Sequence, residues 1–301
     1  MDNAMPTHSP DQLLNSSTTR LLDARRPAVI GRTARLELVF ERRAGRTVIA
    51  HAYAEPPFRI GRSFDVDGAA YVILVCSGPG VFAGDVLSLS LRVASDARVV
   101  LTSQSALQVH PSAAPSPAHI RHRYVVEEEG ELHAHWDPVI PFTGARLDQR
   151  FDLEVGEDSR LYWSDALMAG RISRGEAWRF ESLTHELRLR VGTTLKYLER
   201  YTVTPGLQSV VHPWIVGRMN YVATALVHHP RVTADMAESL HRTLEAAAPQ
   251  EVNAAVDLLE PRLLVGRLLG SCGASFSAAR ASYQELVLAS IFDRPTQLLR
   301  K

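Results

Sequence analysis

The stretch from Cys76 to Asp85 has the composition of a tight turn that could bind a ligand. It reads CSGPGVFAGD, so a Gly-x-Gly-x-x-x-Gly run ends in an acid. Glycines at such spacing can cradle a pyrophosphate, but that requires a helix N-terminus pointing at the anion. Residues 86–93 instead alternate apolar and polar side chains, as a β-strand does. The stretch therefore predicts a strand-to-strand turn, in which Asp85 either caps the turn or faces a ligand.

Two histidines have the spacing of metal ligands. His133 and His135 are alternate residues of a predicted strand, so both side chains point to the same face. A cupin-like or other β-sandwich metal enzyme could use this pair, but it would need a glutamate about four residues further on. Asp137 and Pro138 follow instead. Two solvent-facing histidines are the simpler interpretation, and a metal-dependent enzyme using His133 and His135 is the alternative.

A second distinctive stretch, from Gly170 to Glu176, concentrates charge between two glycines. It reads GRISRGE, which is typical of an irregular connection at the surface. Its arginines and its acid form either an exposed ion pair or a functional loop. The chain has no Gly-x-Ser-x-Gly motif, and neither Cys76 nor Cys272 lies in a recognisable catalytic motif. The sequence therefore gives little support to a nucleophilic enzyme.

The composition restricts the class of partner and the compartment. In 301 residues, 33 basic and 33 acidic side chains cancel, so the charge gives no reason to expect nucleic acid or an anionic membrane as a partner. Two cysteines far apart in the chain do not suggest a disulfide framework. No apolar run approaches the roughly 20 residues of a membrane span. These features favour a cytoplasmic globular protein.

Residues 34–203 predict a mainly β body. Short alternating segments are separated by turns about every ten to fifteen residues, without intervening helices. Stacked sheets in a sandwich, a barrel or a solenoid-like fold all suit this pattern, and periodicity does not choose among them. Residues 1–32 are polar and predict a disordered leader. We expect residues 33–301 to form one domain, with the β body over 33–205 and strands plus two helices over 206–301.

Both predicted helices lie late in the chain. Thr233 suits the N-cap of a helix with a regular apolar face, and Pro249 ends it. A second helix is predicted over residues 277–292 from its inward-facing apolar positions. Apolar strands over 220–227 and 262–269 precede the two helices. These helical faces are expected to pack against the β body.

Four stretches, in this order along the chain, resemble the urease accessory protein UreD (UreH) family. Residues 80–85 look like the family's glycine-rich turn ending in Gly-Asp, and residues 101–106 are similar to its following Thr-rich strand. Residues 132–145 look like its Leu-Glu-Trp-Leu-Pro…Gly-Ala segment, and residues 168–176 match its Gly-Arg-Pro…Gly-Glu loop. The matching motif positions are Gly80, Gly84, Gly144, Gly170, Arg171 and Gly175.

The chain also departs from the family pattern. Ala83 replaces a glycine, and the family's Pro-Pro before the turn is missing. Residues 108–112 read QVHPS where many members carry a Lys-aromatic-Arg-Ser run, and Ile172 replaces a proline. The chain is therefore identified as a divergent member, and contacts made by the missing Lys, aromatic and Arg side chains are not expected here.

The resemblance implies a non-enzymatic scaffold with a mostly β fold and two late helices. It implies binding to the accessory protein UreF, recruitment of the GTPase UreG through UreF, and docking on urease apoprotein during nickel incorporation. No cofactor is expected to bind tightly, but nickel could pass transiently along a water-filled path lined by oxygen ligands. Asp85 and Glu176 match the family's acidic motif positions and are the predicted path-lining groups.

Overall fold

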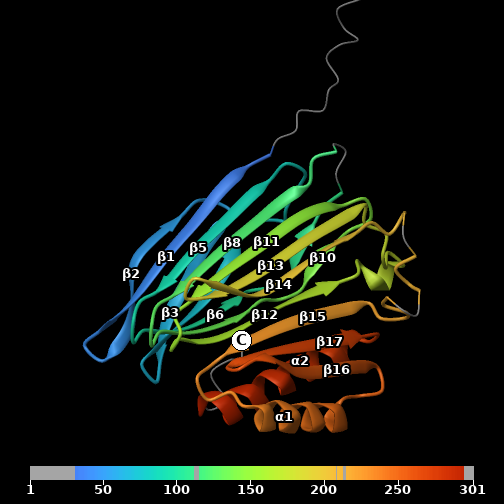
Figure 1. The fold of residues 1–301 in the computed structure, drawn as a ribbon. Helices are drawn as coiled ribbons and strands as arrows, with labels where there is room; N and C mark the ends of the chain where they lie inside the picture. Colours follow the sequence, from blue (N-terminus) through green and yellow to red (C-terminus); the bar gives the residue numbers. More distant parts are fainter. Residues whose placement is uncertain (1–30, 112–114, 208, 213–214, 295–301) are drawn as a thin grey trace, which may run out of the picture.

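The computed structural model describes residues 31–111, 115–207, 209–212 and 215–294 of the chain (Figure 1). The first 30 residues of the predicted disordered leader lie outside the described residues. The remainder folds into two stacked β-sheets, with two helices packed beside one of them (Figure 1).

One sheet has seven strands and the other has ten. The seven-stranded sheet consists of β1 (Thr33–Arg43), β2 (Arg46–Ala54), β5 (Val86–Val93), β8 (Ala118–Val126), β11 (Arg146–Val155), β13 (Ser182–Val191) and β14 (Thr194–Val203). The ten-stranded sheet consists of β3 (Phe58–Val66), β4 (Ala69–Cys76), β6 (Arg98–Ser103), β7 (Leu107–Val109), β9 (Glu131–His135), β10 (Val139–Pro141), β12 (Arg160–Met168), β15 (Tyr221–His228), β16 (Val252–Glu260) and β17 (Leu263–Gly270).

The chain winds between the two sheets as a parallel solenoid. Successive coils run from β4 to β5, from β6 to β8, from β9 to β11 and from β12 to β13. Each strand of a coil pairs in parallel with the corresponding strand of the next coil, in both sheets. Antiparallel strands close the stack, with β2 and β14 at the edges of one sheet and β3 and β16 at the edges of the other. The prediction of a mainly β fold with stacked sheets is therefore confirmed, and of the arrangements that periodicity left open the chain adopts the solenoid-like one.

Inward side chains of the seven-stranded sheet form continuous rows across the coils. One row joins Leu38, Leu91, Tyr124, Leu153 and Leu189, which the strand register places side by side. Each of these residues is at most 1% exposed, so the row lies in the core between the sheets. Each strand points alternate side chains into the core, so the apolar residues of the period-two pattern face inward. The register then aligns them between strands as apolar layers.

The two helices cover the outer face of the last strands of the ten-stranded sheet (Figure 1). Helix α1 (Ala234–Ala247) begins at the predicted N-cap, where the Thr233 hydroxyl accepts a hydrogen bond from the Met236 amide. Helix α2 (Gly273–Val287) begins four residues earlier than predicted and continues into a π-turn, η2 (Leu288–Phe292). Among the described residues, no helix combines the length and the apolarity needed to cross a membrane.

Candidate functional site

The glycine-rich turn joins β4 to β5, as predicted, and rests directly on β7. The Val81 amide donates to the Gln108 carbonyl at 2.9 Å, and the His110 amide donates to the Val81 carbonyl at 2.8 Å. Gly80 has a φ of +130°, and a Cβ placed there would lie 2.2 Å from the Gln108 carbonyl oxygen. The turn therefore needs glycine at this position for both its backbone conformation and its close approach to β7.

Asp85 holds this turn together at its base. Its side chain is 2% exposed and accepts hydrogen bonds from the backbone amides of Phe82, at 3.0 Å, and Arg32, at 2.9 Å. The Arg32 guanidinium lies 3.1 Å from the same carboxylate and also donates to the Gly80 carbonyl at 2.8 Å. Asp85 thus caps its own turn and ties it to the chain entering β1.

The second motif loop is closed by an ion pair between its ends. Arg171 donates to the Glu176 carboxylate with Nε at 2.7 Å and Nη2 at 2.5 Å, around the short 3-10 helix η1 (Ile172–Arg174). The hydrogen bond from Arg171 is the main reason why the pKa of Glu176 is lowered. Gly170 has a φ of +136°, and a Cβ there would lie 2.4 Å from the Glu176 carbonyl oxygen. The loop is therefore salt-bridged, and its glycine has a structural role.

The structure corrects the solvent-facing interpretation of the histidine pair. His133 is 4% exposed, with Nε2 2.9 Å from a Glu131 carboxylate oxygen and its ring 4.6 Å from that of Phe292. His135 is half-buried, with Nδ1 3.1 Å from the Ser164 hydroxyl. Phe292 of the π-turn after α2 covers His133, which strand periodicity alone cannot reveal.

No group of three or more His, Cys, Asp or Glu side chains in the described parts of the chain is arranged to hold a metal ion. Glu131, the partner of His133, is also bound by Arg294 at 3.0 Å. Burial raises the pKa of Glu131, but the hydrogen bonds from His133 and Arg294 outweigh it, and the pKa falls well below its usual value. The geometry therefore does not favour the metal-enzyme alternative.

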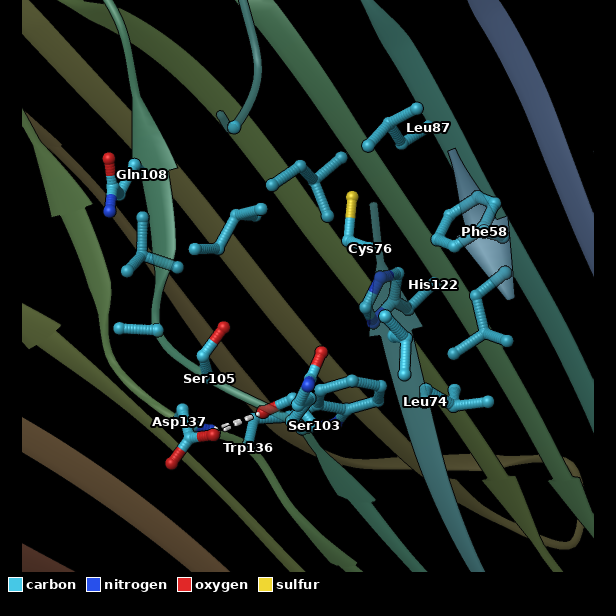
Figure 2. Close-up of a pocket in the computed structure, with 18 of the residues that line it drawn as sticks. Phe58, Leu74, Cys76, Leu87, Ser103, Ser105, Gln108, His122, Trp136 and Asp137 are labelled. Carbon is cyan, nitrogen blue, oxygen red and sulfur yellow. Dashed lines mark hydrogen bonds between the residues drawn. The ribbon is translucent and has the colours of Figure 1, made fainter. Parts of the chain in front are cut away.

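A cavity of about 150 Å³ lies between the sheets beside the glycine turn (Figure 2). Its wall includes the turn, the link from β6 to β7 and inward side chains of both sheets. The Ser103 hydroxyl donates to the Asp137 carboxylate at 2.9 Å and accepts from the Asp137 amide at 2.9 Å, which fixes one rim. Among its lining residues are Phe58, Leu74, Cys76, Leu87, Ser105, Gln108, His122 and Trp136.

Three polar side chains interrupt the apolar layers near this cavity, and two of them, Gln149 and Asp165, line it. Gln149 of β11 and His185 of β13 are neighbours in the parallel register, and their side-chain nitrogens lie 2.7 Å apart. Asp165 of β12 approaches from the other sheet, with a carboxylate oxygen 4.0 Å from His185 Nδ1. Gln149 Oε1 and His185 Nε2 are buried without a hydrogen-bond partner. We call these three residues the polar layer.

Burial shifts the titration of the polar layer in opposite directions. It raises the pKa of Asp165 to about 7, assisted by the nearby carboxylate of Glu199, and it lowers the pKa of His185 to about 4. Glu199 of the edge strand β14 in turn pairs with Arg267 of β17 at 2.9 Å, which links the two sheets. The arrangement can hold a proton on Asp165 near neutral pH and offers unpaired polar atoms to small polar species.

Sequence reasoning missed the polar layer, although a signal was present. Gln149 interrupts the apolar inward positions of its strand, and Asp165 stands in the otherwise apolar run LYWSDALM. A polar residue at a position that must face the core requires a partner or a function. The predicted path-lining residues Asp85 and Glu176 are instead each held by an arginine.

The chain is similar to known proteins along most of its length. A family model described as UreD urease accessory protein matches residues 32–301. A protein of Sorangium cellulosum named urease accessory protein UreD is 34% identical over 210 residues, which cover 70% of this chain and 66% of that protein. A protein of the same name from Herpetosiphon aurantiacus is 25% identical over 272 residues, covering 88% of this chain and 95% of that protein.

Replacing Gly80 with alanine should destabilise the turn more than the same change at Gly78. Both glycines have positive φ, which costs an alanine about 1–2 kcal/mol. Only at Gly80 would the new Cβ meet a backbone oxygen, whereas at Gly78 nothing lies within 4 Å. We expect Gly80→Ala to lower the free energy of unfolding by about 3 kcal/mol in urea titrations. Equal losses for the two variants would contradict the close packing of the turn on β7.

Replacing Asp165 with asparagine should make stability less dependent on pH. Because the folded chain holds this proton up to about pH 7 while the unfolded carboxyl loses it near 3.8, wild-type stability falls as pH rises between these values. The variant lacks this loss, so its free energy of unfolding relative to wild type should rise by about 2–3 kcal/mol from pH 5 to pH 8. Urea titrations of both proteins measure this, and an unchanged difference would show that Asp165 ionises normally in the fold.

Proposed function

The chain belongs to the UreD urease accessory protein family, and from this premise we propose that it serves urease maturation as a non-enzymatic scaffold for nickel incorporation. The observation that carries the proposal is the family match over residues 32–301, which includes both sheets and both helices. A match limited to one motif would support only the presence of a similar turn in both, and not a common fold or role.

We propose that the scaffold acts in the cytoplasm by binding a UreF-like protein, recruiting the UreG GTPase through it, and docking on urease apoprotein. The arrangement of the motif loops supports a role in assembly. Phe142 donates its amide to the Val109 carbonyl at 2.9 Å, and Gly144 donates to the Arg179 carbonyl at 3.0 Å. Loops on a rigid frame are the usual place for binding residues, and here those that carry the family motifs lie together.

We further propose that nickel passes transiently near Asp85 and Glu176, with no tightly bound cofactor. Carboxylate oxygens suit a divalent ion that must later be released. Each of these carboxylates is paired with an arginine, so a passing cation would have to compete with Arg32 or Arg171. Their role in nickel transfer and their role in holding the loops need separate tests.

Co-expression with a UreF-like protein should yield a stable mixed complex. We expect size-exclusion chromatography with light scattering to give a mass equal to a sum of both chains, with the chain expressed alone as the control. A chain that runs alone in both cases and retains a transition metal would contradict the scaffold proposal. His133 and His135 would then be the residues to mutate.

The double variant Asp85→Ala/Glu176→Ala should lower the nickel content and the activity of co-expressed urease while the chain stays folded. A second double variant, Asp85→Asn/Glu176→Gln, removes the charges but keeps hydrogen-bond acceptors. If the carboxylates line the nickel path, both variants should fail to load urease. Normal loading by the amide variant would assign the two residues a purely structural role. Glu127→Ala/Glu154→Ala, which removes two ion-paired carboxylates, one just after β8 and one in β11, is the matched control.

A further inference from the structure

A row of stacked side chains crosses the end of the molecule where the motif loops meet. The rings of Phe82 and His110 are parallel, with centroids 4.5 Å apart. His110 then meets the ring of Phe142 edge-on at 5.0 Å, and the Arg171 guanidinium lies 4.1 Å from the centre of that ring. The row joins four separate loops and presents Phe82, which is 40% exposed, at its outer end.

The connection from β14 to β15 lies at the same end (Figure 1). Its described residues include further exposed apolar side chains. Leu207 is 86% exposed, and Val211 and Ile215 are each 57% exposed. Val210 of this connection is buried, at 4% exposed, in the apolar cluster that also contains Val81 of the glycine turn. The exposed side chains of Leu207, Val211 and Ile215, in contrast, make no contribution to the core.

The carboxylates of the two motif loops are already neutralised. In residues 77–85 and 169–181 the acids are Asp85, Glu176 and Glu181, and each is paired with an arginine. Three other arginines at this end, Arg174, Arg179 and Arg218, form no direct ion pair among the described residues, although Arg174 lies close enough to Glu176 to lower its pKa. All three are exposed.

We propose that this end is a docking surface for a protein that presents apolar side chains surrounded by carboxylates. We call it the loop face, and it consists of Phe82, Leu207, Val211, Ile215, Arg174, Arg179 and Arg218. Exposed apolar groups rimmed by charge are typical of protein interfaces, in which aromatic and arginine side chains carry much of the affinity. Three unpaired arginines select an acidic partner, because like charges would repel a basic one. The inference rests on the proposed function, which requires partner proteins.

Two exposed leucines of β14 show why charge, and not apolar exposure alone, indicates the chemistry of the partner. Leu195 and Leu198 lie on the edge strand β14, where Lys196 pairs with Glu260 and Arg200 pairs with Glu186. That edge therefore carries no excess of either charge and gives no indication of a partner's chemistry. The loop face differs because its cations exceed its anions.

A binding assay tests whether the loop face is a docking surface. A UreF-like protein and urease apoprotein are bound separately to the immobilised chain, and the affinity of each is measured. We expect Arg179→Glu/Arg218→Glu to weaken binding of at least one of them by roughly tenfold or more. The matched charge reversal Arg42→Glu/Arg46→Glu, at the β1–β2 hairpin on the opposite end, should change binding by less than about twofold. Wild-type binding should weaken with added salt, since exposed charges are screened.

A second pair of variants tests the apolar part of the surface. Ile215→Asp should weaken the same interaction as the arginine reversals, while Leu195→Asp on β14 should not. Circular dichroism and thermal melts identify any variant that fails to fold. Unchanged binding by both loop-face variants would overturn the inference while leaving the proposed function intact. Absence of wild-type binding to either protein would overturn both, and self-association of the chain that Ile215→Asp abolishes would show that the occupant is a second copy.

Discussion

The in-register parallel pairing of successive coils is the constraint on which the rest of this structure depends. It satisfies the backbone hydrogen bonds of both sheets and fixes which side chains meet across neighbouring strands. An inward residue on one coil therefore lies beside the equivalent residue of the next, as in the row from Leu38 to Leu189. Where the equivalent positions are apolar they form the core, and at Gln149 and His185 they form the polar layer instead.

The same pairing explains why motifs far apart in the sequence lie together. Strands β5, β8, β11 and β13 are parallel and aligned, so all four begin at the same end of the molecule. The segments that enter them must then be neighbours, and they include the Gly80–Asp85 turn and the Gly170–Glu176 loop. Asp85 fastens the first of these segments to Arg32, and Arg171 closes the second on Glu176. A scaffold that concentrates its loops in this way can offer a single partner several loops at once.

Much of the fold could be predicted from the sequence, because period-two patterns and capping residues act locally. The strand-to-strand turn before Val86, the N-cap at Thr233 and the late helices all follow from local rules. The choice of a solenoid over a barrel depends on pairing between distant strands, which one sequence does not reveal. Strand β16 escaped prediction because its buried positions do not alternate regularly and its sequence contains two alanines and two acids.

The candidate site was less accessible to sequence reasoning. The motif residues were identified, but the burial of His133 depends on η2, which follows in the chain more than 150 residues later. The partnership of Asp85 with Arg32 likewise crosses 53 residues. The polar layer could have been suspected at Asp165, since an acid at a core-facing position of an apolar strand is expensive. Predicting that Asp165 lies near Gln149 and His185 would have required the register of three strands and the stacking of two sheets.

The central claim is that the gathered loops contact the partner proteins of a urease-maturation scaffold. Hydrogen–deuterium exchange tests it most directly, with the free chain compared with its complex with a UreF-like protein and urease apoprotein. Slower exchange in the complex should be concentrated in residues 77–85, 169–181 and 215–219. The β1–β2 hairpin at the opposite end should exchange as in the free chain. Protection confined to that hairpin or to the helices α1 and α2, with unchanged exchange in the loops, would contradict this assignment.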